Sequence, residues 1–333
     1  MAKIRELIEQ AGSAAEESVV AAKNRYLDQV RGVLRDLTRL KFTDRQGVES
    51  QHTSVPIKIV PGLPKPLEKV GEQELPSGER WGIEQIGLWA HDIKSLLTLS
   101  RNLGSLVATL LHADGWHERA EKYGATLDDT AKLARELADH AAKAELLKRI
   151  TEINEDILGV YMPTSRLFPD RGQIEIYWVV IGALARLLGV DAEALAVVVM
   201  AHELAHAYTH VGLDSNSNRW EEGFWECDRG IMEGLAQFYT HKTAEALRDE
   251  RGHERVWIAY ARLTELQKAN GAKAYVNHLD WVKTISPEAM RQGLLDLRRG
   301  HIKREIGTFC DELTYLARRY PLKGKHEHGS SQK

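Results

Sequence analysis

The chain of 333 residues is poor in cysteine, with only Cys227 and Cys310. Two cysteines so far apart in the sequence provide neither a disulfide framework nor a CxxC zinc ribbon. A reducing compartment is therefore favoured. The first ten residues, MAKIRELIEQ, are interrupted by charged side chains and lack the apolar core of a secretory signal. We expect a cytoplasmic protein.

Long apolar runs and an excess of one charge are also absent. The most apolar stretch, residues 176–201, is interrupted by Arg186, Asp191 and Glu193, and its longest uninterrupted piece falls short of the ~20 residues that span a bilayer. The 45 Lys and Arg residues nearly balance 48 Asp and Glu residues, giving a net charge of -3. We therefore expect neither a membrane nor a nucleic acid as partner. The patterns GxGxxG and GxSxG and the P-loop are missing as well.

The composition is that of a globular protein, with 43% hydrophobic and 28% charged residues. Five of the nine prolines lie within residues 55–77, so this segment is predicted to be a linker with one short strand at residues 57–60. Since the length is about twice that of a typical domain, we expect two parts. These are a helical N-terminal region over residues 1–150 and a second domain over residues 151–322, followed by a disordered tail at 323–333.

The N-terminal region has helical periodicity throughout. Apolar residues recur at three- and four-residue steps over residues 4–40, which predicts an amphipathic helix broken near Gly12. Residues 81–112 and 126–151 are rich in Ala, Leu, Lys and Glu, which are good helix formers. The region is therefore predicted to be mainly helical.

The second domain begins with β-rich sequence and continues with helices. Runs near residues 159–161 and 174–177 predict a small sheet. A helix at 180–188 is expected to stop at Gly189 and the next to be capped by Asp191. The predicted fold class is α+β, mostly α. The predicted helices after the sheet are 180–188, 192–210, 228–248, 254–269, 287–298 and 301–319.

The strongest motif is HExxH at residues 202–206, inside the predicted helix 192–210. Two histidines four positions apart on a helix lie about 6 Å apart along its axis and on one face, so His202 and His206 can bind one metal ion. Nitrogen ligands at this spacing suit zinc. Glu203 can reach water on that ion and act as general base. The alternative is that both histidines are ordinary core residues.

A catalytic zinc needs a third protein ligand and an open position for water. The metzincin pattern fails, because it requires Gly and His where the chain has Thr209 and Gly212. His210 would lie about 12 Å along the axis from His202, too far to share the ion on a straight helix. Asp214 would require the following loop to turn back sharply.

The remaining candidates are acidic residues after that loop: Glu221, Glu222, Glu226 and Glu233. Glu233 is the preferred third ligand, because it lies in a predicted buried helix, where an acid without such a role is costly. Gly234 and Ala236 are expected to let this helix pack closely against the HExxH helix. Glu226 is the alternative ligand, or a residue that contacts the ligands without binding the metal itself.

On these motifs, residues 157–248 resemble the gluzincin branch of the zincin metallopeptidases. EGLA at 233–236 is similar to the glutamate-helix motif of gluzincin aminopeptidases, and HELAHAYTH at 202–210 resembles the HExxHxxxH form of ImmA/IrrE-type metallopeptidases. In thermolysin-type enzymes the interval to the third ligand is shorter, which would favour Glu226. The aspartate that follows their ligand glutamate by four residues is Gln237 here.

The resemblance implies zinc held by His202, His206 and a glutamate, with Glu203 as general base in hydrolysis of a peptide or protein substrate. It also implies a short sheet whose edge strand binds extended substrate, supplied by the strands near 159–161 and 174–177. Residues suited to stabilising the oxyanion are Tyr161, His241, Tyr275 and His278.

Two alternatives concern regulation and function. Cys227 lies close to the proposed Glu233 helix and is suited to act as a regulatory thiolate on zinc, or is an ordinary reduced thiol. The competing function is a non-enzymatic module that binds a partner or senses a signal on a zincin-like fold. An intact Glu203 favours the enzyme, since structural zinc needs no adjacent base. Oligomeric state has no sequence signal.

Overall fold

The structure is a computed structural model in which helices predominate. The helices predicted at residues 81–112 and 126–151 and the tail at 323–333 lie outside the residues that it describes. The described residues are 2–42, 55–71, 74–75, 157–163, 172–220, 223–269 and 271–322.

The chain divides into two compact units, Met1–Ile8 with Lys65–Ile153, and Glu9–Pro64 with Asn154–Lys333. In the described part of the first unit, β1 (Ala2–Lys3) pairs antiparallel with β3 (Glu74–Leu75), and α3 spans Lys65–Gly71. α1 (Ile4–Gly12) begins in this unit.

The predicted boundary at residue 150 lies close to the division between Ile153 and Asn154, but residues 9–64, which were assigned to the N-terminal region, belong to the larger unit. The predicted strand β2 (Ile57–Val60) is present, but it pairs parallel with β5 (Gln173–Tyr177), more than a hundred residues later. A parallel pair needs a long crossover connection and leaves no local sequence signal. A single boundary drawn from composition therefore separates residues 9–64 from the rest of the larger unit.

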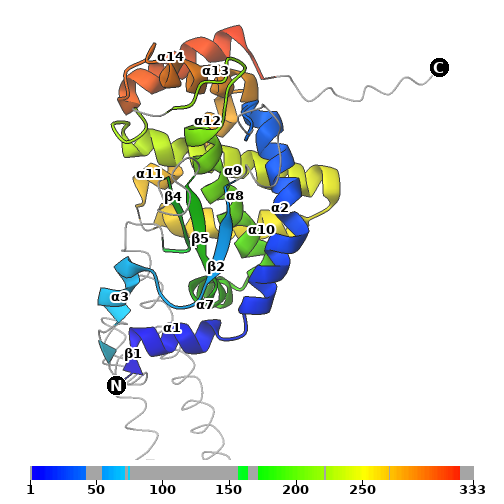
Figure 1. Cartoon of the computed structure of the whole chain (residues 1–333), viewed down its shortest axis with the longest axis vertical. Coiled ribbons are helices and arrows are strands. Elements are labelled where there is room, and N and C mark those ends of the chain that lie inside the picture. The colour runs from blue at the N-terminus through cyan, green and yellow to red at the C-terminus, as the bar shows by residue number, and fades with distance from the viewer. Residues whose placement is uncertain are drawn as a thin grey trace, which may run out of the picture. The chain divides into compact units, whose positions relative to one another are not determined.

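The larger unit is mostly helical around a small mixed sheet, which confirms the predicted α+β class (Figure 1). The break predicted near Gly12 is also confirmed, since α1 ends there and α2 begins at Glu16. In the described part of the chain, no helix is long and apolar enough to cross a membrane. The helices of this unit after α1 are α2 (Glu16–Thr38), α7 (Trp178–Leu188), α8 (Ala192–Val211), α9 (Arg229–Arg251), α10 (Glu254–Ala269), α11 (Lys273–Val276), α12 (His278–Thr284), α13 (Pro287–Arg298) and α14 (Ile306–Arg319).

The sheet has the order β2-β5-β4, with β4 (Gly159–Met162) antiparallel to β5 at one edge. Tyr177 N donates to Leu158 O at 3.0 Å. Since antiparallel hydrogen bonds alternate along a strand, the main-chain groups of Val160 also face β5. Those of Gly159 and Tyr161 therefore face away from it, toward the outer edge of β4.

α8 forms the centre of the larger unit and is buried along almost its whole length. Its first turn is capped by Asp191, whose side chain accepts from Ala194 N at 2.9 Å, as predicted. The preceding helix α7 stops at Gly189, which adopts a positive φ of 66° that favours glycine. Because the surface of α8 is apolar all round, this helix must be covered by other elements on several sides.

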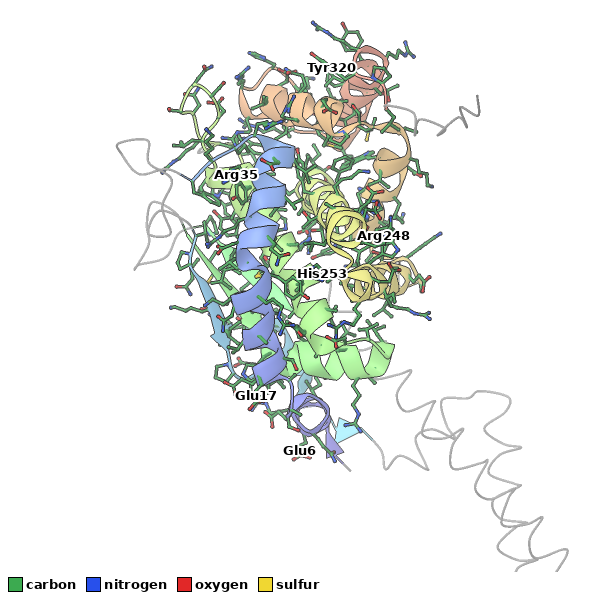
Figure 2. The ribbon with its side chains drawn as sticks, turned by 90° about the vertical axis from the view of Figure 1, so that its right-hand side faces the viewer. Glu6, Glu17, Arg35, Arg248, His253 and Tyr320 are labelled. Carbon is green, nitrogen blue, oxygen red and sulfur yellow. The ribbon has the colours of Figure 1, made fainter. Side chains whose placement is uncertain are left out.

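α2 covers one of those sides, and Figure 2 shows it crossing the face of the larger unit from Glu17 to Arg35. The hydroxyl of Tyr208 on α8 donates to Arg31 O at 3.3 Å. Lys23 Nζ donates to Ile57 O at 2.9 Å and so ties α2 to β2. Burial of the apolar stripe of α2 makes this helix part of the core: the stripe is Val19, Ala22, Tyr26, Val30 and Leu34.

Candidate metal centre

α8 and α9 bring together the three side chains predicted to bind metal. His202 Nε2 lies 3.1 Å from His206 Nε2, and Glu233 Oε2 lies 3.3 and 3.4 Å from these two nitrogens. All three residues are buried. This group can hold a metal ion.

The distances among the three donor atoms fit a tetrahedral ion. Ligand bonds of about 2.0–2.1 Å in a regular tetrahedron place neighbouring donors about 3.3–3.4 Å apart, and the observed separations are 3.1 to 3.4 Å. Glu233 Oε2 is buried close to both rings without hydrogen-bond geometry to either. Buried polar atoms are normally satisfied, so a cation between these donors accounts for the arrangement.

The electrostatics of Glu233 also suit a ligand. Burial alone would raise the pKa of this carboxyl, but the imidazoles of His206 and His202 hold it well below its ordinary range. Arg229 Nε lies 3.8 Å from Glu233 Oε1 and adds a further positive charge. The side chain is therefore an anion that can bind a metal.

Glu203 follows His202 on α8 and packs against Gly159 of strand β4. It is almost fully buried, with 2% of its surface exposed. A Cβ atom on Gly159 would lie 3.0 Å from Glu203 Cγ, 3.1 Å from Glu203 Oε1 and 2.9 Å from Val199 Cγ1. The absence of a side chain on Gly159 thus lets β4 approach the carboxylate closely.

Glu226 does not join the centre. It lies before α9, whose N-cap is Asp228, rather than on the same helical face as Glu233. Its side chain is 70% exposed and pairs with Arg304. The alternative assignment of Glu226 as ligand or supporting residue is therefore not supported by the structure. Glu221 and Glu222 lie outside the described residues.

His210 and Asp214 have structural partners. His210 Nδ1 lies 3.1 Å from the hydroxyl of Tyr161 on β4. Burial, with the positive charge of Arg298, lowers the pKa of His210 to about 4, so its ring is neutral near pH 7. Asp214 accepts from the main-chain nitrogens of Asn216 and Asn218 at 2.8 and 2.9 Å and shapes the loop after α8.

The predicted reason for close packing of α9 is wrong at Gly234. A Cβ atom there would lie 2.5 Å from the ring of Trp281 on α12, so the missing side chain makes room for Trp281. The partner element could not be read from the sequence, because both faces of α9 are apolar near Glu233.

Tyr275 is the oxyanion candidate that lies beside the metal-binding residues. Its ring centroid is 6.0 Å from that of His202, and its hydroxyl accepts from Arg229 at 3.3 Å. The hydroxyl of Tyr161, in contrast, is engaged by His210. Sequence reasoning did not single out Arg229, which has no motif of its own.

The other two candidates, His241 and His278, belong to a hydrogen-bonded chain through Tyr260. The Tyr260 hydroxyl lies 2.6 Å from His278 Nε2 and 3.1 Å from His241 Nδ1. His278 Nδ1 lies 2.9 Å from Tyr275 O, which can only accept, so this nitrogen donates. His278 therefore anchors the main chain of Tyr275.

Arg298 is a second residue that sequence reasoning missed. Its guanidinium donates to Thr209 O at 2.8 Å, Gly212 O at 2.6 Å and Asn218 O at 2.9 Å. Burial lowers its pKa to about 10, so it stays charged. It holds the C-terminal end of α8, where helical carbonyls lack partners within the helix.

Cys227 is buried, and its position does not favour a regulatory role. Burial and the neighbouring charge of Asp228 raise the pKa of its thiol to about 12. Because metals bind the thiolate, a neutral thiol is a poor zinc ligand.

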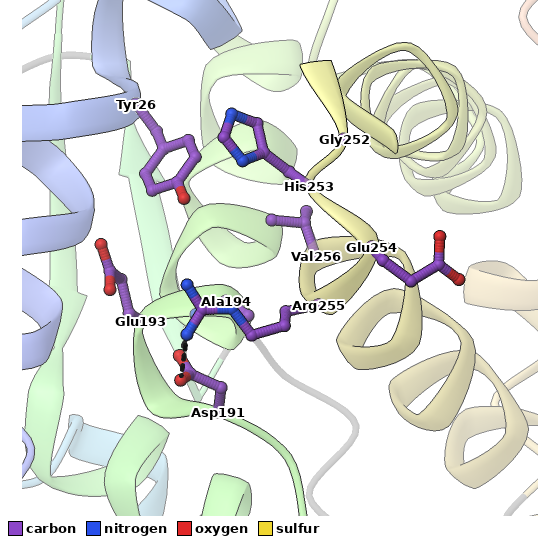
Figure 3. A pocket seen from close by; sticks show the side chains of 9 residues that line it. All are labelled: Tyr26, Asp191, Glu193, Ala194, Gly252, His253, Glu254, Arg255 and Val256. Atoms are coloured by element: carbon purple, nitrogen blue, oxygen red, sulfur yellow. Dashed lines mark hydrogen bonds and ion pairs between the residues drawn. The ribbon is translucent and has the colours of Figure 1, made fainter. Parts of the chain in front are cut away.

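A separate pocket lies at the first turn of α8, next to the turn between α9 and α10 (Figure 3). Asp191 pairs there with Arg255 at 3.0 Å, and Glu193 pairs with Arg25 at 2.8 Å. Since His202 follows Ala194 by eight residues, about 12 Å along the helix, this pocket is distinct from the metal centre.

Comparisons of the chain with protein-family models, with curated proteins and with solved structures find no match.

Proposed function

We propose that the protein is a zinc-dependent metallopeptidase that hydrolyses peptide bonds. The observation that carries this proposal is the convergence of His202 Nε2, His206 Nε2 and Glu233 Oε2 within 3.4 Å of one another, with Glu203 adjacent. Two imidazoles and one carboxylate are a donor set that suits catalytic zinc. Buried Cys227 and partly buried Cys310 are both free thiols, which supports the inference of a cytoplasmic location.

Zinc, when bound, supplies a Lewis acid that polarises a carbonyl and makes water more acidic. In the hydrolysis a water oxygen bonds to the peptide carbonyl carbon, the C–N bond breaks, and Glu203 carries the proton of the water to the departing nitrogen. The ring of Tyr275 lies beside that of His202, and its hydroxyl, which accepts from Arg229, is suited to donate a hydrogen bond to the oxyanion.

The outer edge of β4 supports binding of an extended peptide. Main-chain groups of Gly159 and Tyr161 face this edge, and no described strand pairs with it. A peptide in extended conformation adds to such an edge through its own main chain. Of the two strands predicted for this role only β4 is suited, because β5 is central and paired on both sides.

The direct test is digestion of a mixed peptide library by the full chain with and without 1,10-phenanthroline. We expect cleavage by the zinc-loaded protein and loss of cleavage after chelation, with far-ultraviolet circular dichroism retained and activity restored by added zinc. The centre links only α8 and α9, and the core around it is extensive, so the fold does not depend on the ion.

Two results would contradict the proposal. If no zinc-loaded sample cleaves any peptide, the proposed peptidase function is excluded. Loss of circular dichroism together with the metal, again without cleavage, instead supports the non-enzymatic module with a structural ion.

A second prediction concerns the fit of β4 against the general base. Gly159→Ala is expected to reduce hydrolysis at least about tenfold, because the new methyl group displaces Glu203 and a misplacement near 1 Å costs up to ~100-fold. Bound zinc should be unchanged. The matched control is Gly32→Ala on α2, where a Cβ atom meets nothing within 4 Å. Equal rates for Gly159→Ala and the wild type would show that β4 does not position the base.

A further inference from the structure

Aromatic rings gather at the C-terminal end of α8, next to the metal centre. His210 is stacked on Phe224, with ring centroids 4.2 Å apart and planes inclined by 17°. Trp220 and Trp225 meet Phe224 edge-on at 5.4 and 5.1 Å. Tyr161 meets His210 edge-on at 5.9 Å. We call these five residues the aromatic shelf.

Trp225 differs from the rest of the shelf in its exposure. It is 59% exposed, whereas Trp220 and Phe224 are 2% and 3% exposed. An exposed tryptophan is not needed for the core, and burying one contributes much to an interface. Its ring is nonetheless supported, because it lies against Phe224 and 6.0 Å from His210. An exposed indole that is held in place by the rings beneath it can pack against an apolar group of a ligand.

The shelf is continuous with the strand edge proposed to bind substrate. His210 follows His206 by one helical turn, about 6 Å along the axis. Tyr161 belongs to both features, since its side chain bonds to His210 while its main chain faces the outer edge of β4. A peptide placed along that edge therefore lies beside Tyr161, which joins the edge to the shelf through His210.

The charges around the shelf favour an apolar ligand group over a basic one. The hydroxyl of Tyr161 and Nδ1 of His210 satisfy each other. Arg219 acts electrostatically on both of these groups, and its positive charge opposes a lysine or arginine of a ligand. Nearby, Glu226 is neutralised by Arg304.

We propose that Trp225 forms a subsite for one bulky apolar side chain, preferably aromatic, of an extended peptide bound along β4. This inference rests on the proposed peptidase function, which it deepens by naming a substrate class. The ligand ring packs against the exposed indole, and its neighbours in the peptide pair with Gly159 and Tyr161.

The test uses equilibrium binding, so that it does not depend on turnover. The full-length, zinc-loaded Glu203→Gln variant is titrated into fluorescein-labelled Ala/Gly octapeptides that carry a single Phe at each position in turn. One position is expected to bind at least about tenfold more tightly with Phe than with Ala or Lys. Adding Trp225→Ala should abolish that preference, and Trp225→Phe should retain it. Ile258→Ala, which removes an exposed apolar side chain on α10, is the matched control and should change nothing.

The outcomes separate the subsite from the peptidase. An unchanged Phe preference after Trp225→Ala overturns the subsite, and library cleavage by the wild type then leaves the peptidase standing. A binding preference for Lys, or equal binding of all the peptides, also overturns the subsite. If no peptide binds and the wild type cleaves nothing, both proposals fail together.

Discussion

Replacing Glu233 by alanine is expected to reduce bound zinc from about one equivalent to well below about 0.1 after dialysis, and to abolish hydrolysis. The variant removes the only carboxylate of the three converging donors. Two neutral imidazoles alone bind zinc weakly. Loss of a residue that only hydrogen-bonds to a ligand already lowers metal affinity by about 10–100-fold, and loss of a ligand is expected to lower it further. The measurement is metal content by atomic emission, alongside the hydrolysis rate.

The matched control is Glu226→Ala, a change from the same residue type at an exposed position. Among the described residues Glu226 pairs with Arg304 at the surface, and exposed pairs contribute about 0–1 kcal/mol to stability. Zinc content and hydrolysis should equal those of the wild type. His326 and His328 lie in the tail and can bind metal on their own, so both variants are compared after deletion of residues 323–333. Zinc lost from Glu226→Ala but retained by Glu233→Ala would reverse the assignment.

The sequence predicts well the two histidine ligands, whose relative positions depend on a single helix. His202 and His206 converge because four residues make about one turn, whatever surrounds α8. The caps that bound this helix and its predecessor, Asp191 and Gly189, are equally local. Local rules therefore predicted α8 and the placement of both histidines on one face.

Glu233 was predicted from an energetic argument, that an acid in an apolar helix needs a partner. The structure does place Glu233 beside both imidazoles. Glu226 lies seven residues before Glu233, a spacing that would place both on one helical face, but α9 begins only after Asp228. A short capping motif, Asp followed by Arg and Gly, carried that information in the sequence.

The features that sequence reasoning missed depend on contacts between distant segments. β2 joins the sheet through parallel pairing with β5, and Arg229 meets Tyr275 across α9 and α11. Trp225 is one of eight tryptophans in the sequence, and nothing distinguishes it from the others until the fold shows that it is exposed and lies beside Phe224 and His210. Such contacts have no periodicity or motif from which they can be predicted.

Replacing Glu203 by glutamine is expected to lower kcat/KM for peptide hydrolysis by about 10³-fold, or roughly 4 kcal/mol in transition-state free energy, while leaving zinc content unchanged. Glutamine keeps the size and shape of the side chain, so it fills the same space beside Gly159 and Val199. It cannot accept the proton of the attacking water. Alanine is a poorer choice, because it would also leave a cavity against β4.

Two measurements on Glu203→Gln, and the activity of Glu203→Asp, separate chemistry from structure. Zinc content should match the wild type because His202, His206 and Glu233 are untouched, and the denaturant midpoint should change little. Glu203→Asp keeps the base but withdraws it by one methylene, so it should retain more activity than glutamine if proton transfer is the role of the side chain. Cleavage at the wild-type rate by Glu203→Gln would exclude this residue as the base and would place any peptidase activity elsewhere in the chain.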